Sequence, residues 1–264
     1  MGNLQSLGDV LRRRFSIVPA PTDPEPPEPI PCAICGGIEW LRRDVPLDDP
    51  AFGKAFPCSC VAAAWEEQRQ AAIRAWCALP ATMARCTFES LERRQDIPGW
   101  DAAVQACLRY ARGESEQPIL ILMGGNGTAK SHLGLSILNW RLAHGGPYGR
   151  YANTADWLDE LRATFNKPEG YDILGMTFDQ LWESYVKADL VMLDDLGMQQ
   201  STPWAREKLE QFLDHRYREA LPTILTTNLT REQLGPRLES RLRHERLVKA
   251  ILLDGPDYRL KGGA

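Results

Sequence analysis

Short apolar runs alternate with longer segments of helical spacing from about residue 80 to the end of the chain. The runs have the length of buried strands and lie at or near residues 119–123, 150–152, 189–195 and 222–228. Between them, residues 131–144 and 202–220 carry apolar side chains at helical spacing, and Thr202 followed by Pro203 is a strong helix start. This alternation predicts an α/β domain over residues 80–264, with helices on both faces of a parallel sheet.

The first 79 residues follow a different pattern, which predicts two further segments. Residues 4–15 place apolar side chains at helical spacing beside three arginines, and a proline-rich linker follows. Residues 1–30 would therefore form an amphipathic helix and its linker, and this helix either binds another molecule or folds back onto its own domain. Residues 31–79 would form a small second domain that ends in a helix over residues 61–78.

Two close pairs of cysteines indicate a metal site in this small domain. Cys32 and Cys35 form a C-x-x-C pair, and Cys58 and Cys60 form a C-x-C pair. Each pair can bring two thiolates to one ion, and the residues between the pairs can form a small loop or hairpin that completes a tetrahedron. The spacing predicts a structural Zn²⁺ site, with four ordinary thiols as the alternative. The cysteines without such partners are predicted to be buried apolar residues, namely Cys77, Cys86 and Cys107.

Composition and charge bear on two classes of function, binding of nucleic acid and association with a membrane. The 264 residues carry a net charge of −4, so nucleic acid would have to bind at local basic patches. No apolar run approaches the roughly 18 residues that cross a bilayer, and the first 30 residues hold no secretion signal. We therefore expect a cytoplasmic protein without a membrane partner.

The sequence GGNGTAKS, residues 124–131, lies between a predicted strand and a predicted helix. It differs by one residue from the phosphate-binding pattern G-x-x-x-x-G-K-[ST], whose structural context this is. Backbone N–H groups would hold the phosphates of ATP, Lys130 would reach the β- and γ-phosphates, and Ser131 would ligate Mg²⁺. The predicted nucleotide-binding residues are Gly124, Gly125, Asn126, Gly127, Thr128, Ala129, Lys130, Ser131 and His132.

Ala129 stands where the pattern has its second glycine. If the backbone here has a positive φ, the Cβ atom costs roughly 1–2 kcal/mol, and its methyl group could crowd a phosphate. This could weaken nucleotide binding about tenfold without abolishing it, because the charges of Lys130 and Mg²⁺ contribute more. The loop is therefore predicted to function, with slow turnover.

Polar side chains also end two of the predicted strands. Asp194 would hold Mg²⁺ through water, and Asp195 is placed to polarise the attacking water. Asn228 could donate to the γ-phosphate and accept from the same water. The alternatives are a solvated turn for the acidic pair and a loop-capping role for the asparagine.

A run of basic residues near the end of the chain has two interpretations. The run comprises Arg237, Arg241, Arg243, Arg246 and Lys249. Such a run is usually the solvated face of a helix. Alternatively, one guanidinium could reach the γ-phosphate of a neighbouring subunit, where added positive charge assists phosphoryl transfer.

The phosphate loop, LDDLG, LTTN, SRL and DYR occur in this order, and residues 80–260 thereby resemble the AAA+ ATPases of the DnaC/IstB group. This group comprises replicative-helicase loaders and transposition helper ATPases. The Cys₄ segment and LPATMARCTFESL resemble the DnaC/DnaI-like loader branch more closely. The resemblance implies an ATP-binding core that assembles into a spiral or ring, with nucleotide at subunit interfaces and single-stranded DNA in the middle.

The resemblance also implies roles for individual residues. Arg241 in SRL would be an arginine finger acting in trans, and Arg259 in DYR would be a sensor arginine acting in cis. The residues that it places at single-stranded DNA are Arg162 and Phe165 in LRATF, and Thr202 and Trp204 after LDDLGMQQ. An arginine and aromatic rings suit sequence-tolerant binding of single strands, whereas packing in the core is the alternative for the two aromatic side chains.

The main functional hypothesis is an ATP-dependent loader of a DnaB-type replicative helicase onto single-stranded DNA. Residues 1–75 would hold the helicase, and the AAA+ domain would bind ATP, Mg²⁺ and DNA as an oligomer. One rival is an IstB-like transposition helper ATPase that assembles on duplex DNA. The other is a nucleotide-gated binding module that does not hydrolyse ATP because of Ala129.

Overall fold

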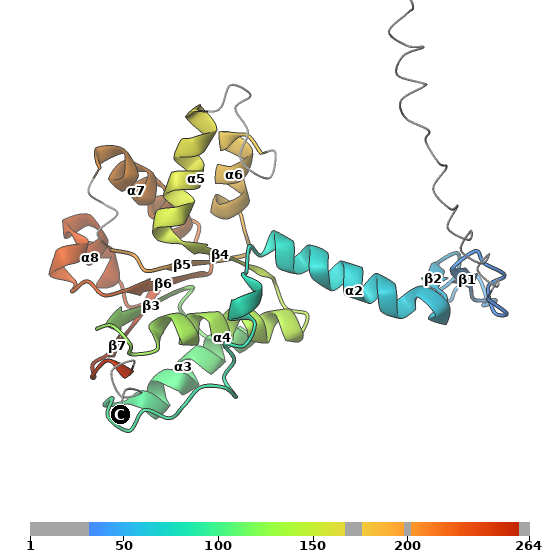
Figure 1. Cartoon of the computed structure of the whole chain (residues 1–264), viewed down its shortest axis with the longest axis horizontal. Helices are drawn as coiled ribbons and strands as arrows, with labels where there is room; N and C mark the ends of the chain where they lie inside the picture. Colours follow the sequence, from blue (N-terminus) through green and yellow to red (C-terminus); the bar gives the residue numbers. More distant parts are fainter. Residues whose placement is uncertain (1–31, 167–175, 198–201, 259–264) are drawn as a thin grey trace, which may run out of the picture. The chain divides into compact units, whose positions relative to one another are not determined.

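The computed structural model describes residues 32–166, 176–197 and 202–258, which belong to two units (Figure 1). One unit is the part of the chain up to Glu67, and the other begins at Gln68. The division falls within a helix, α2 (Ser59–Trp76). The predicted helix at residues 4–15 and the proline-rich linker lie outside the described residues.

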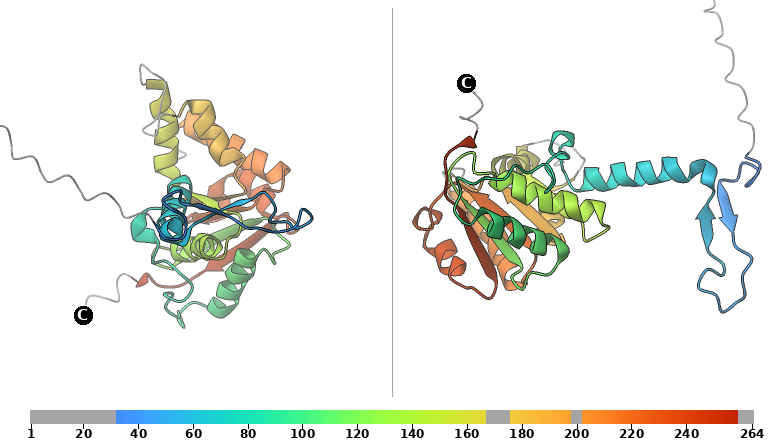
Figure 2. Two further views of the ribbon diagram at one scale, coloured as in Figure 1. Left: turned by 90° about the vertical axis from the view of Figure 1, so that its right-hand side faces the viewer. Right: turned by 90° about the horizontal axis from the view of Figure 1, so that it is seen from below.

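The N-terminal unit contains a small antiparallel hairpin and the start of α2, both visible in Figure 2. Its strands are β1 (Trp40–Arg42) and β2 (Ala55–Pro57), and they pair with Leu41 opposite Phe56. The rings of Trp40 and Trp65 meet edge to face with their centroids 4.4 Å apart. A hairpin is one of the two connections predicted between the cysteine pairs, a small loop being the other. The helix α2 begins and ends two residues earlier than the helix predicted over 61–78.

The second unit is built on a five-stranded parallel sheet with the order β4-β5-β6-β3-β7. The strands are β3 (Ile119–Gly124), β4 (Gly149–Asn153), β5 (Leu190–Asp194), β6 (Thr223–Thr227) and β7 (Val248–Leu253). In β3, which lies between β6 and the edge strand β7, Ile121 lies opposite Leu225 on one side and Ala250 on the other. Because all pairings described for this sheet are parallel, the carboxyl ends of the strands meet at one edge.

Helices cover both faces of the sheet because the side chains of each strand alternate between the faces (Figure 1). From β3, Leu120 and Leu122 pack in the cluster that contains α3 (Trp100–Arg112) and α4 (Lys130–Ala143). Ile119 and Ile121 point into the opposite cluster. The helices of that cluster are α5 (Thr154–Asn166), α6 (Phe178–Val186) and α7 (Pro203–Arg218). A parallel sheet between two helical layers confirms the predicted fold class.

The predicted start of α7 is confirmed in detail. The hydroxyl of Thr202 accepts a hydrogen bond from the N–H of Ala205 at 3.2 Å, and Pro203 is the first helical residue.

The sequence pattern did not identify α3, α5, α6 or β7. The basic run at 237–249 divides between the short helix α8 (Pro236–Leu242), a turn, and the first residues of β7.

Two of the three unpaired cysteines are buried, as predicted. Cys77 and Cys107 lie in the cluster around α3 and α4, whereas Cys86 packs against that cluster and is half-buried. Burial raises the pKa of the Cys77 thiol to about 11 and that of Cys107 to about 12, so both stay neutral. Within the described part of the chain, no helix has the length and apolar character needed to span a bilayer.

Candidate functional site

The phosphate loop follows β3 and leads directly into α4, as the sequence predicted. Two of its glycines lie where the loop passes close to residues 253–258. At Gly124, with φ of 144°, a Cβ atom would lie 2.1 Å from the carbonyl oxygen of Leu253. At Gly127, with φ of 63°, it would lie 1.7 Å from a carboxylate oxygen of Asp257. No larger residue fits at either position.

Ala129, which stands where the pattern has its second glycine, adopts a left-handed backbone conformation. Its φ is 68° and its ψ is 19°, and it occupies the N-cap position of α4. For a residue with a Cβ atom this conformation costs roughly 1–2 kcal/mol. The methyl group packs against the hydrophobic cluster around α4, which offsets part of that cost. The strain considered from the sequence is therefore present in the loop.

Lys130 is buried, with 7% of its surface exposed, and its ammonium group lies inside the loop. The Nζ atom donates to the carbonyl oxygen of Gly125 at 2.5 Å and lies 3.5 Å from the hydroxyl of Thr128. The Thr128 hydroxyl in turn donates to the Gly125 carbonyl at 2.9 Å. The arrangement holds a positive charge beside the backbone N–H groups at the start of α4, where an anion is favoured.

Ser131 and Asp194 meet at the carboxyl edge of the sheet. The Ser131 hydroxyl donates to Oδ1 of Asp194 at 2.8 Å, and Thr226 on β6 donates to the same oxygen at 2.5 Å. The Tyr151 hydroxyl lies 3.3 Å from Oδ2, and burial together with the nearby Asp194 carboxylate raises the pKa of this tyrosine. A hydroxyl and a carboxylate held side by side are ligands of the kind that Mg²⁺ takes, so these residues fit the predicted magnesium site.

Asp195 and Asn228 lie together in front of the phosphate loop. Asp195 has φ of 56°, and its N–H donates to the hydroxyl of Thr226 at 2.9 Å, which fixes the turn after β5. The amide nitrogen of Asn228 donates to Oδ1 of Asn126 at 2.9 Å and lies 3.5 Å from Oδ1 of Asp195. Asn126, Asp195 and Asn228, which were predicted from separate motifs, thus lie together.

These residues line one cavity of about 520 Å³. The segment before α3 also lines the cavity, which the sequence did not predict, and so does Tyr258 of the DYR motif, in which Arg259 was predicted to serve this site. Their contributions, with two residues from β4 and β6, are Ser90, Leu91, Glu92, Arg94, Asn153, Thr226 and Tyr258. His132, predicted as part of the nucleotide site, lies in the same wall, with Nε2 3.2 Å from the Ser90 hydroxyl and 3.1 Å from the carbonyl of Thr87.

Arg241 lies away from this cavity, on α8. It forms an ion pair with Asp214 on α7, and its guanidinium carbon lies 5.4 Å from the centroid of the Tyr217 ring. It shares a small pocket with the first residues of β3, β6 and β7, at the amino edge of the sheet. The phosphate loop is at the carboxyl edge, so Arg241 is not brought to the site of its own chain. Arg259 lies outside the described residues.

Three residues predicted to contact DNA lie together, with Thr202 and Trp204 at the start of α7 and Arg162 on α5. The guanidinium of Arg162 donates to the hydroxyl of Thr202 at 3.3 Å and lies 4.9 Å from the centroid of the Trp204 ring. Trp204 is half-buried and also packs against the core cluster of α5, α6 and α7. Phe165 belongs to α5, but its side chain lies outside the described residues.

The four paired cysteines of the N-terminal unit converge, with all four sulfurs within 4.8 Å of one another. Cys32 and Cys58 are 3.8 Å apart at Sγ, and Cys35 and Cys60 are 3.7 Å apart. Tetrahedral Zn²⁺ with Zn–S bonds of about 2.3 Å requires sulfurs about 3.8 Å apart, so the cluster fits this ion. Hydrogen bonds from the backbone of Cys35 and Ile34 lower the pKa of the Cys32 thiol to about 6, whereas the hydrogen bond with the Cys58 thiol raises the pKa of Cys60 to about 12.

The chain is similar to known proteins in sequence. The family model of the IstB-like ATP binding protein matches residues 62–254. The replicative helicase loader DnaC of Buchnera aphidicola subsp. Schizaphis graminum is 27% identical over 163 residues, which are 60% of this chain and 63% of that protein. A protein of Mycobacterium tuberculosis, named as an ATP-binding protein in an insertion sequence, is 29% identical over 192 residues, which are 67% of this chain and 69% of that protein.

The fold is similar to that in the crystal structure of the DnaC helicase loader. The TM-score is 0.55 at 18% sequence identity, and the match covers 67% of this chain and 100% of that chain. At this identity the likeness shows the fold alone. The match to the DnaC of Buchnera spans less than two thirds of that protein, 63% of its length.

Proposed function

The chain belongs to the family of IstB-like ATP binding proteins, in the DnaC/IstB group of AAA+ ATPases, and we propose that it loads a replicative helicase onto single-stranded DNA with the use of ATP. The observation that carries the proposal is the convergence of the phosphate loop, the Asp194–Asp195 pair and Asn228 around one cavity. The similarity to DnaC, a replicative helicase loader, supports loading as the use of that site.

In the proposed site, the phosphate loop holds the triphosphate of ATP. Lys130 exchanges its contact with the Gly125 carbonyl for the β- and γ-phosphates, and the loop N–H groups bind the remaining oxygens. The Ser131 hydroxyl would ligate Mg²⁺, and Asp194 would hold the ion through water. When bound, Mg²⁺ neutralises the charge that develops on the phosphates during transfer.

Hydrolysis in this proposal depends on the two residues in front of the loop. The Asp195 carboxylate orients and polarises the attacking water, and Asn228 holds the γ-phosphate and the water with the two ends of its amide. Their separation of 3.5 Å supports a shared task, because one water could contact both. Turnover would be slow, since the strain at Ala129 remains in the loop.

The active form is proposed to be an oligomer, a spiral or ring with nucleotide between subunits. Arg241 lies at the amino edge of the sheet, so it would serve the phosphate loop of a neighbouring subunit as an arginine finger. Arg259, next to Tyr258 of the cavity wall, would be the sensor arginine of its own site. Both arginines would add positive charge around the γ-phosphate.

Single-stranded DNA would bind at the start of α7 in the middle of the oligomer. Arg162 offers a charge for phosphate, Thr202 offers a hydroxyl, and the partly exposed ring of Trp204 offers a surface for a base. Phe165 would add a second ring. These groups bind backbone and ring faces rather than base edges, so the proposed binding has little sequence preference.

The N-terminal part is proposed as the arm that holds the helicase. It would comprise the helix and linker of residues 1–30 and the zinc-binding segment with its connecting helix at 31–79, ahead of an AAA+ domain at 80–264. Zn²⁺ on Cys32, Cys35, Cys58 and Cys60 would have a structural role, because four sulfurs leave no open coordination position.

A pull-down with the cognate DnaB-type hexameric helicase tests the proposal. The full chain should retain the helicase, and a variant that lacks residues 1–75 should not. Equal retention by both would contradict the role of the arm, and no retention by either would contradict helicase loading.

The similarity to a protein of an insertion sequence supports a second candidate function, that of a transposition helper ATPase. This function predicts assembly on duplex DNA in the presence of ATP and no affinity for the helicase. Electron microscopy of the chain with duplex DNA and ATP distinguishes the two, because a filament on the duplex would favour the transposition helper.

A further inference from the structure

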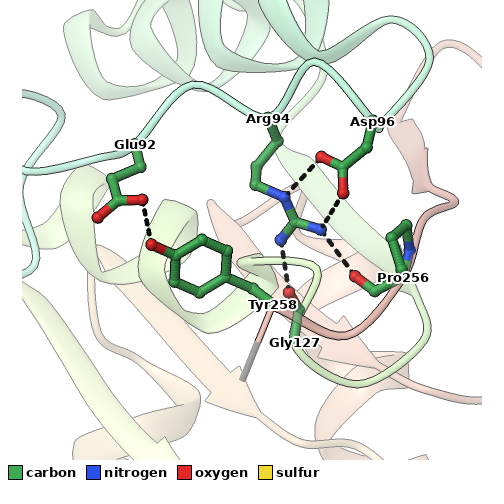
Figure 3. A network of polar contacts seen from close by, with 6 residues as sticks. All are labelled: Glu92, Arg94, Asp96, Gly127, Pro256 and Tyr258. Carbon is green, nitrogen blue, oxygen red and sulfur yellow. Dashed lines mark hydrogen bonds and ion pairs between the residues drawn. The ribbon is translucent and has the colours of Figure 1, made fainter. Parts of the chain in front are cut away.

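One buried guanidinium joins three segments that are distant in sequence (Figure 3). Arg94 precedes α3 and is 4% exposed. Its Nε and Nη2 atoms donate to the two carboxylate oxygens of Asp96, at 2.9 and 3.1 Å. Nη1 donates to the carbonyl of Gly127 in the phosphate loop at 2.7 Å, and Nη2 also donates to the carbonyl of Pro256 at 2.7 Å. The side chain thus ties the phosphate loop to the C-terminal segment that follows β7.

The C-terminal segment also contacts the loop directly. The N–H of Tyr258 donates to the same Gly127 carbonyl at 3.2 Å. Asp257 fills the space beside Gly127 in which a Cβ atom would otherwise lie. The ring of Tyr258 lies over the Arg94 guanidinium, with 5.3 Å from its centroid to Cζ, and its hydroxyl donates to Glu92. The ring and both segments line the cavity proposed for the nucleotide.

The position of Arg94 has a consequence for the loop backbone. The Gly127–Thr128 peptide is trans, so its carbonyl and the N–H of Thr128 point in opposite directions. Two donors, from Arg94 and Tyr258, hold the carbonyl on the outer side of the loop. The N–H of Thr128 is therefore directed away from Arg94, and N–H groups of such a loop bind phosphate oxygens.

We propose that Arg94 is a positioning residue for nucleotide binding and hydrolysis, which orients the Gly127–Thr128 peptide and couples the phosphate loop to residues 254–258. This inference rests on the proposed nucleotide site and deepens it. A nucleotide in the loop then restrains residues 254–258. Arg94 is part of the cavity wall, and the role proposed for it is carried out through the groups that it holds.

Hydrogen–deuterium exchange of the full chain without nucleotide tests the coupling. Arg94→Ala should speed exchange both at residues 124–131 and at residues 250–258. The matched control is Arg93→Ala, since Arg93 is exposed and pairs only with the exposed Asp101 among its described ion pairs. That variant should leave both segments as in the native chain. A change confined to the neighbourhood of residue 94 would overturn the proposal.

Steady-state hydrolysis of MgATP separates positioning from a structural role. Arg94→Ala should lower kcat/KM about tenfold at a temperature well below its melting point. Guanidinium at low millimolar concentration should restore part of the loss, because it can enter the space left by the side chain. Arg94→Met, which fills that space, should show the loss without the rescue. Native kcat/KM in Arg94→Ala, or equal effects of guanidinium on all variants, would overturn the proposal.

The two measurements keep this inference separate from helicase loading. Neither requires helicase or DNA, so a chain that loads no helicase can still show both effects. If the native chain binds no nucleotide, the proposed function fails, and the exchange experiment still decides whether Arg94 couples the two segments.

Discussion

The hydroxyl of Ser131, in the first turn of α4, donates a 2.8 Å hydrogen bond to the Asp194 carboxylate at the end of β5. The two residues are 63 positions apart in sequence and belong to different motifs. Adjacent parallel strands bring their carboxyl ends to one edge of the sheet, and β3 delivers Ser131 to the same edge through the phosphate loop. The contact joins a phosphate site to a carboxylate of the kind that holds Mg²⁺.

Replacing Ala129 by glycine should stabilise the protein and speed hydrolysis. Release of the left-handed strain stabilises the variant, whereas the lost packing of the methyl group and the greater conformational freedom of glycine in the unfolded chain oppose it. We expect the free energy of unfolding to rise by about 0.5–1 kcal/mol. Thermal unfolding and MgATP turnover measure the two effects. Ala220→Gly is the matched control, because Ala220 also has a positive φ, of 50°, but does not line the cavity. It should gain stability without a change in turnover.

Turnover of the native chain also decides whether it hydrolyses ATP at all. If native protein and Lys130→Ala turn over ATP at the same background rate, the chain is a nucleotide-gated module without hydrolysis. If Ala129→Gly is no faster than the native chain, the left-handed alanine does not limit the rate.

Arg241 should act on the site of another subunit. Arg241→Ala and Lys130→Ala are each expected to be inactive alone, whereas their mixture should recover activity. The reason is that one variant supplies an intact phosphate loop and the other an intact arginine. MgATP hydrolysis against mixing ratio measures this. Arg243→Ala, which removes a cation from an exposed pair with Glu239, is the control and should keep native turnover. A mixture no more active than its components would exclude action in trans.

Binding of single-stranded DNA should depend on Arg162 and Trp204. Alanine at either position is expected to weaken binding about tenfold or more, since a lost stacking surface costs roughly 1–3 kcal/mol per base. Fluorescence anisotropy with a labelled oligonucleotide measures the affinity, and Lys187→Ala, an exposed cation paired with Glu183, serves as control. If Trp204→Ala lowers the melting temperature and leaves DNA affinity unchanged, the ring is a core residue only.

Removal of zinc should unfold the N-terminal unit and leave nucleotide binding in place. The purified chain is expected to contain about one zinc per chain, and a chelator or Cys58→Ser should release it. Metal analysis and hydrogen exchange over residues 32–57 measure both effects. Cys86→Ser, at a cysteine outside the cluster, should retain the metal. A metal-free chain with unchanged exchange over these residues would contradict a structural zinc site.

The sheet was predictable because its inner strands are short apolar runs bounded by polar turns. β3, β5 and β6 were found in this way, and the phosphate loop could be recognised from its position between β3 and α4. β7 was missed although residues 250–253 form a short apolar run that could have indicated it. It is an edge strand with only partial burial, and the basic run overlaps its first residues at Lys249.

The walls of the cavity could not be predicted, because they come from tertiary contacts without a local pattern. Arg94 and Pro256 are 162 residues apart, and nothing in the sequence distinguishes Arg94 from the exposed Arg93 beside it. Arg216 is a similar case, fully buried with its guanidinium on the carbonyls of Tyr185, Val186, Ala188 and Pro222. Burial of an arginine on backbone carbonyls depends on how the chain returns on itself.

Isothermal titration calorimetry with MgATP on the folded, zinc-loaded chain tests the nucleotide site most directly. The native chain should bind about one nucleotide per subunit, and Lys130→Ala should lose most of the affinity, because the buried ammonium group is the only positive side chain inside the described phosphate loop. No heat of binding from the native chain, or the same affinity in Lys130→Ala, would contradict a triphosphate site between Lys130 and Asp194.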